Sequence, residues 1–99
     1  MRMMLKMSIP VEAGNAALKE GRMPMILGKL MEQLKPEAAY FYAENGKRTA
    51  IMVFDMKDTS HIPVIAEPGF MGLNADISLT PVMNGDDLKA GLEMLAKSM

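Results

Sequence analysis

Apolar and polar residues alternate along the first strand-like segment of the chain, residues 2–9. Its odd positions are all apolar: Met3, Leu5, Met7 and Ile9. Its even positions are mostly polar: Arg2, Met4, Lys6 and Ser8. A period of two residues predicts a β-strand with one face towards a core. Pro10 ends the pattern.

The rest of the chain divides into helical and strand-like segments by periodicity and by its proline and glycine residues. Helices are predicted at 11–20, 24–34 and 58–67, with a last helix after Asn84. Strands are predicted at 38–43, 48–55 and 75–83. Pro68 and Gly69 are expected to stop the third helix. Pro81 has no amide donor, which predicts that the last strand lies at a sheet edge.

The segment AAYFYAENGKRTAIMVFD, residues 38–55, predicts a hairpin around Asn45-Gly46. Both central positions of a type I′ turn need positive φ, and Asn and Gly tolerate it best. Such a turn pairs Tyr42 with Thr49, Tyr40 with Ile51 and Ala38 with Val53. The remaining face of the hairpin is wholly apolar and is expected to meet the helices: Ala39, Phe41, Ala43, Ala50, Met52 and Phe54.

The predicted order of elements is β-α-β-β-α-β with an added C-terminal helix, in a single domain over residues 1–99. This order is the ferredoxin-like pattern of the α+β class. In such folds the helices cover one face of an antiparallel sheet. The C-terminal helix is expected to have Asn84 as its N-cap and an apolar stripe of Leu88, Leu92 and Leu95.

No helix is predicted to cover the second face of the sheet, which we call the open face. Its expected members are Met4, Lys6, Ser8, Ala38, Tyr40, Tyr42, Thr49, Ile51, Val53, Asp55, Asp76, Ser78, Thr80 and Val82. Large apolar patches are uncommon in water, and polar groups in a dry core need partners. We therefore expect a second copy to lay its open face over this one, with the polar groups lining a cavity between the sheets.

Charge and composition exclude several classes of function. The net charge is −1 with lysines and arginines scattered, so nucleic acid is not an expected partner. The start of the chain, MRMMLKMSIP, is too short and too interrupted by charge for a signal sequence or a membrane span. The chain has no cysteine, which excludes disulfides and thiolate sites and fits the cytoplasm. Its 13 methionines would allow a thioether copper site, but their alternation in the first strand indicates core filling.

His61 is the one histidine and the only side chain whose ordinary pKa lies near neutrality. At the start of a helix it can act as a neutral catalytic base, or it can simply be an exposed capping residue. Asp58 and His61 have helical i, i+3 spacing, but no third ligand for a metal is evident. No motif for a nucleotide or a metal cofactor is present, so no cofactor is predicted.

Lys6 stands in the middle of an otherwise buried strand. It is expected to pair with Asp55 or Asp76, to extend to the mouth of the cavity between the two sheets, or to meet an anionic ligand. Tyr40 and Tyr42 either pack at a dimer interface or offer hydroxyl groups to a ligand. With Asp55 and Ser78, these residues form the predicted ligand-binding set.

Two segments carry a resemblance to a known fold family. LKPEAAYFYAENGKRTAIMVFDMKD and IAEPGFMGLNADISLTPVMN are similar to a family of small uncharacterised bacterial proteins. That family is assigned to the dimeric α+β barrel superfamily, which includes antibiotic-biosynthesis monooxygenases and muconolactone-isomerase-like proteins. The predicted β-α-β-β-α-β order with a two-sided sheet also resembles that superfamily. The resemblance implies a homodimer with pockets in or beside the barrel. It implies no reaction, because one fold hosts many functions, and no catalytic motif of the monooxygenases is matched.

The leading hypothesis is thus a cytoplasmic homodimer that binds a small, partly apolar molecule between its sheets. This molecule is either neutral or anionic. The first alternative is a cofactor-free isomerase or monooxygenase, with His61 as base and Lys6 or the tyrosines stabilising negative charge. The second is a structural or interaction module with a filled interior. A ligand site requires a cavity of about 300 Å³ or more, and an enzyme also requires His61 within its reach.

Overall fold

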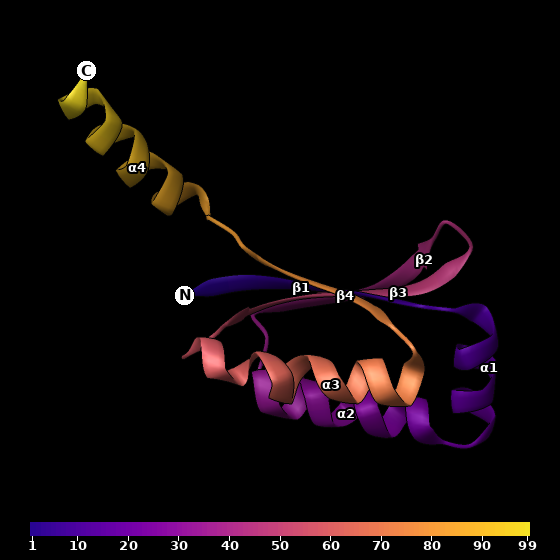
Figure 1. Ribbon diagram of the computed structural model, residues 1–99. Helices are drawn as coiled ribbons and strands as arrows, with labels where there is room; N and C mark the ends of the chain where they lie inside the picture. The colour runs from indigo at the N-terminus through magenta and orange to yellow at the C-terminus, as the bar shows by residue number, and fades with distance from the viewer.

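The computed structural model describes residues 1–99 as an α+β protein with a four-stranded antiparallel sheet. The elements in chain order are β1 (Arg2–Ile9), α1 (Val11–Lys19), α2 (Arg22–Leu34), β2 (Ala38–Glu44), β3 (Lys47–Asp55), the 3-10 turn η1 (Thr59–His61), α3 (Ile62–Leu73), β4 (Asp76–Pro81) and α4 (Gly85–Ser98). Most predicted boundaries lie within two residues of these bounds. The sheet order is β2-β3-β1-β4 (Figure 1).

The β2–β3 hairpin forms as predicted. Asn45 has φ 53° and Gly46 has φ 75°, the two positive values that a type I′ turn requires. The register pairs Tyr42 with Thr49, Tyr40 with Ile51 and Ala38 with Val53. β4 lies at the edge of the sheet, where the missing amide of Pro81 is tolerated.

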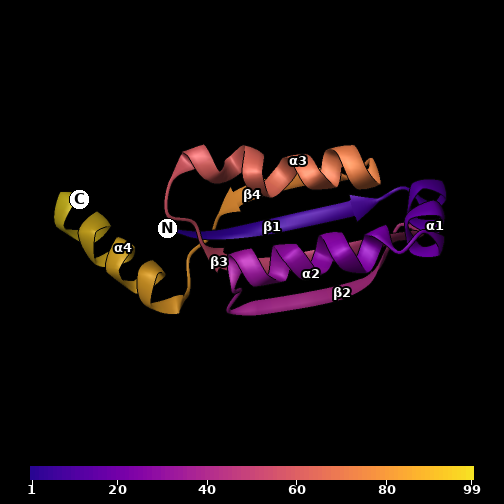
Figure 2. The ribbon, with the colours of Figure 1, turned by 90° about the horizontal axis from the view of Figure 1, so that it is seen from below.

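One layer of helices covers one face of the sheet. Figure 1 shows α1, α2 and α3 on the same side, and Figure 2 shows α2 and α3 running along the strands. The core lies between these layers, and its largest buried side chains are Leu5, Met7, Met52, Phe54 and Leu73. The predicted inward positions of β1 and of the body of β3 are therefore confirmed.

The helix predicted at 58–67 runs further than expected, because α3 continues through Pro68 and Gly69 to Leu73. The missing amide of Pro68 frees the carbonyl group of Val64, and Val64 is exposed to water. A Cβ atom on Gly69 would lie 2.8 Å from Ile77 Cδ1 and 3.0 Å from Met7 Cε. Gly69 thus allows α3 to lie close against the ends of the Ile77 and Met7 side chains, and it does not mark a helix end.

The tip of the hairpin departs from the predicted core. Phe41 and Ala43 were expected to meet the helices, but both are exposed, Phe41 by 55%. Figure 1 shows the hairpin tip bending away from the helical layer. The prediction is wrong for these two residues because this bend carries them away from the helices that would cover them.

α4 stands apart from the rest of the chain. It begins with the predicted cap, in which Asn84 Oδ1 accepts a hydrogen bond from the Asp87 amide at 2.8 Å and Asp87 accepts one from the Asn84 amide. Its predicted stripe of Leu88, Leu92 and Leu95 is present, yet all three leucines are about half exposed. Figure 1 shows that no other element lies against this helix.

Candidate functional site

The open face consists of three rows of side chains that cross all four strands. The register places Tyr40, Ile51, Lys6 and Ser78 in the middle row. On one side lies a largely apolar row of Ala38, Val53, Met4 and Thr80. On the other lies a polar row of Tyr42, Thr49, Ser8 and Asp76. The face therefore grades from apolar to polar along the strands, and no helix of the chain covers it (Figure 1).

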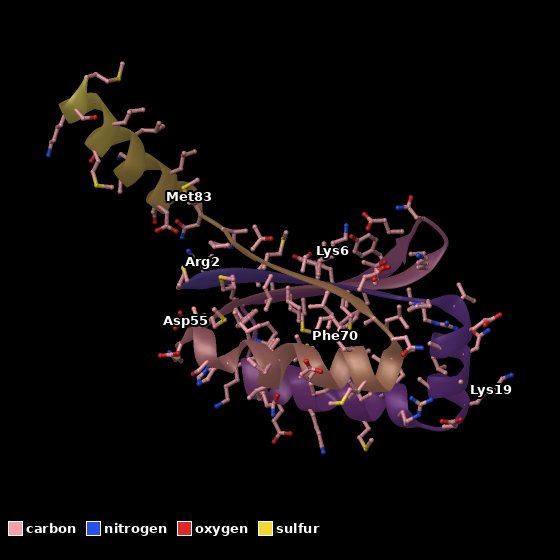
Figure 3. All side chains as sticks on the ribbon, in the orientation of Figure 1. Arg2, Lys6, Lys19, Asp55, Phe70 and Met83 are labelled. Atoms are coloured by element: carbon pink, nitrogen blue, oxygen red, sulfur yellow. The ribbon has the colours of Figure 1, made fainter.

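Lys6 is the charged centre of the open face. It extends from the side of the sheet opposite the helices (Figure 3). Its Nζ lies 2.6 Å from Glu44 Oε2, so the side chain spans β3 to reach β2. The expected pairing with Asp55 or Asp76 is wrong, because the hairpin brings a nearer carboxylate to the same face. The hydrogen bond to Glu44 raises the pKa of Lys6 and keeps it charged.

Glu44 is a member of the open face that the sequence prediction missed. It shares the parity of Tyr40 and Tyr42 in β2, so alternation alone could have placed it there. The Tyr42 hydroxyl donates to Glu44 Oε1 over 3.4 Å, and Glu44 thus joins Tyr42 to Lys6. Tyr40 is 67% exposed and lies opposite Ile51.

Asp55 lies at the far end of β3 and belongs to a different group of charges. It accepts hydrogen bonds from Lys57 Nζ at 2.8 Å and from the amino group of Met1 at 2.6 Å. The hydrogen bond from Lys57, followed in size by the one from this amino group, lowers the pKa of Asp55 to about 2. Lys6 lies opposite Ile51 in the register, and Ile51 is four residues before Asp55 on β3. That spacing puts Asp55 about 13 Å along the strand from the level of Lys6. Figure 3 shows this separation between Asp55 and Lys6.

Stability in acid should depend on Asp55. Because folding lowers its pKa from 3.8 to about 2, its ion pairs stabilise the fold above pH 4 and lose that effect as pH falls towards 2. Asp55→Asn should therefore lower the free energy of unfolding at neutral pH and flatten its decline between pH 4 and 2. Urea unfolding at several pH values measures both effects. Asp76→Asn, at a carboxylate without an ion pair, is the control. Equal acid sensitivity of wild type and Asp55→Asn would contradict this role.

His61 lies on the helix side of the sheet, at the end of η1, where its side chain is exposed. It lines a hollow between the end of α2 and the start of α3, which we call the α2–α3 hollow. The hollow has a volume of about 640 Å³. Its apolar wall includes Phe54, Val64 and Ile65, and its polar rim includes Lys35, Lys57, Asp55 and His61.

The structure therefore separates the predicted site residues into two groups. Lys6, Tyr40, Tyr42 and Ser78 lie on the open face. Asp55 and His61 line the α2–α3 hollow. Asp58, beside His61, accepts a hydrogen bond from the Ser60 amide at 2.8 Å, which lowers the pKa of its carboxyl group. No three metal-ligating side chains come together.

Comparison with known proteins gives no family to which the chain can be assigned. No protein-family model matches the chain, and no curated protein matches it. None of its helices combines the length and the apolar character that crossing a membrane requires. What the fold defines is thus a small α+β protein with one covered and one uncovered sheet face.

Proposed function

We propose that this chain is one subunit of a cytoplasmic homodimer that binds a small, partly apolar molecule between two open faces. The architecture would be a dimeric α+β barrel built from two ferredoxin-like subunits. The strand order β2-β3-β1-β4 and the antiparallel pairing support this assignment, since β1 and β3 lie at the centre of the sheet. Helices on one face alone leave the other face for a partner.

The middle row of the open face is the observation that carries this proposal. Tyr40 and Ile51 present apolar surface beside the charged Lys6 and the hydroxyl of Ser78. Tyrosine is enriched at protein interfaces because its ring buries apolar area and its hydroxyl keeps a polar partner. A second sheet laid over this row would bury the rings and leave the polar groups facing an enclosed space.

The ligand that fits such a space has an apolar body and groups that accept and donate hydrogen bonds. Lys6 offers a cation, and Glu44 and Tyr42 offer an acceptor and a donor close to it. An anionic ligand would have to share Lys6 with Glu44. The chemical class is therefore a small aromatic or aliphatic metabolite with a polar or carboxylate group.

The α2–α3 hollow is a second candidate position for the same class of ligand. Its volume of about 640 Å³ falls in the range of about 300–1,000 Å³ that small-molecule sites occupy. Lys35 forms no ion pair, so its charge is free to meet a carboxylate. This position lies within a single subunit and needs no dimer.

The geometry does not favour the isomerase or monooxygenase alternative. That alternative needs His61 and either Lys6 or the tyrosines at one ligand. His61 lines the α2–α3 hollow, whereas Lys6, Tyr40 and Tyr42 lie on the open face. Within one subunit His61 and these open-face side chains therefore face separate spaces. We propose binding and assign no reaction.

Light scattering and a thermal-shift screen test the proposal. We expect a dimer at micromolar concentration, and a rise in melting temperature with some small aromatic or carboxylate metabolites. Lys6→Ala should abolish the rise if the ligand lies between the open faces, whereas Lys35→Ala should abolish it if the ligand lies in the hollow. Each variant is the matched control for the other. A monomer, or no shift with any compound, would contradict the proposal.

A further inference from the structure

The subunit exposes more surface than its size requires. Its solvent-accessible surface is 6554 Å², whereas a monomer of this mass typically exposes about 5,600 Å². Its radius of gyration is 16.0 Å, against about 13 Å for a compact chain of this length. The longest dimension, 56 Å, runs out along α4 (Figure 1). The excess of about 1,000 Å² is close to what one partner contributes to a typical stable interface, about 800 Å².

α4 has the pattern of a helix that packs on another surface. Leu88, Leu92 and Leu95 lie on one side of it, with Lys89, Glu93 and Lys97 on the other. All six of these side chains are exposed. Most of the stability of such a helix comes from packing of its apolar stripe, and nothing in its own subunit supplies that packing (Figure 1).

The start of α4 is held against the end of the sheet. Arg2 Nη1 lies 3.0 Å from Asp87 Oδ2, and Arg2 Nε lies 2.6 Å from Glu37 Oε1. The amide of Val82 donates to the Arg2 carbonyl group at 3.1 Å, and the Asn84–Asp87 capping box follows at once. Figure 3 shows Arg2 and Met83 beside this junction. Folding α4 back over its own sheet would break these contacts, so its outward direction is anchored.

That direction leads towards the place of the proposed partner. Figure 1 shows α4 leaving the sheet on the side opposite α1, α2 and α3, which is the side of the open face. Figure 2 shows it extending beyond the end of the strands. A second copy seated on the open face would thus lie within reach of the helix, whose 14 residues span about 21 Å.

We infer that α4 is an exchanged arm, which packs its leucine stripe against the partner subunit of the homodimer. Two-fold symmetry makes the contact reciprocal, so each subunit gives one arm and receives one. This inference rests on the proposed dimer and adds to it a second, independent contact surface. The occupant is a second copy of this chain because the excess surface of one subunit matches one side of a dimer interface.

Tryptophan fluorescence tests the arm, since the chain has no natural tryptophan. Leu92→Trp places the probe in the stripe, and Glu93→Trp places it one residue away on the polar side. In the dimer of the 99-residue chain we expect emission at shorter wavelength and several-fold weaker acrylamide quenching for Leu92→Trp than for Glu93→Trp. Dilution to the monomer should remove the difference. Light scattering on the same samples gives the oligomeric state.

Each outcome decides a separate point. A dimeric Leu92→Trp chain that is quenched as strongly as Glu93→Trp would overturn the arm and leave the dimer standing. A wild type that is monomeric would overturn the dimer itself. Protection of the Leu92→Trp probe that persists in the monomer would overturn the arm by showing that α4 packs on its own subunit. A Leu92→Trp chain that is monomeric beside a dimeric Glu93→Trp chain would support the arm, because only the stripe position then disturbs assembly.

Discussion

Replacing Leu5 by alanine is expected to lower the free energy of unfolding by about 2–5 kcal/mol, the range for emptying a leucine site in a core. Leu5 is 1% exposed and lies in β1, a central strand. Its register neighbours are Met52 on β3 and Leu79 on β4. Both neighbours are held in the sheet, so the cavity left by the substitution can close only in part.

Urea unfolding of wild type and Leu5→Ala at one protein concentration measures this loss. The concentration must be matched, because dimer formation would add to the apparent stability. Glu67→Ala changes an exposed position on α3, outside the proposed contact surfaces, and serves as the control, with an expected change within about 0.5 kcal/mol. A loss below about 1 kcal/mol for Leu5→Ala, well under the range for a buried leucine, would contradict the assignment of the core to this face of β1.

Replacing Ile51 by aspartate is expected to weaken dimerisation by about 100-fold or more, equivalent to about 3 kcal/mol. Ile51 lies at the middle of the open face, between Tyr40 and Lys6. In a dimer joined through that face, the substitution would add a second carboxylate beside the Lys6–Glu44 ion pair. Each subunit would then bury one negative charge in excess of its lysine, and burial of charge is costly. The isolated subunit should remain folded, because the side chain faces solvent there in part.

Sedimentation equilibrium over a range of concentrations measures the dissociation constant, and circular dichroism checks the fold. Met71→Asp is the matched control, since it adds the same charge at a position on α3 that is 75% exposed and outside both proposed contact surfaces. An unchanged dimer in Ile51→Asp would exclude the open face as the interface. It would also remove the inter-sheet position of the ligand, and only the α2–α3 hollow would remain.

The hairpin and the two faces of the sheet could be predicted because their determinants are local. Asn45 and Gly46 both adopt the positive φ that their type I′ turn demands. That turn sets the register, and the register assigns every β2 and β3 residue to a face. The capping box of α4 follows from the Asn84 and Asp87 side chains alone.

The candidate site could be predicted only in part. Alternation placed Lys6, Tyr40, Tyr42 and Ser78 on one face, and the structure agrees. It could not identify the partner of Lys6, because a lysine of that length reaches several carboxylates on the same face. Asp55 and Asp76 lie on the two strands next to β1, yet the Lys6 side chain reaches across β3 to Glu44 on β2. The α2–α3 hollow could not be predicted, because it forms where two helices distant in sequence meet.

The sequence by itself determined the elements, the turn and the side of the sheet on which each strand residue lies, since a few neighbouring residues decide each of these. Only the tertiary structure decided that α3 passes through Pro68 and Gly69, that Phe41 stays uncovered and that α4 has no partner in its own subunit. These outcomes depend on which surfaces meet in space. Packing between distant segments overrides local propensity whenever the free energy gained by burying apolar area exceeds the free energy of the local preference.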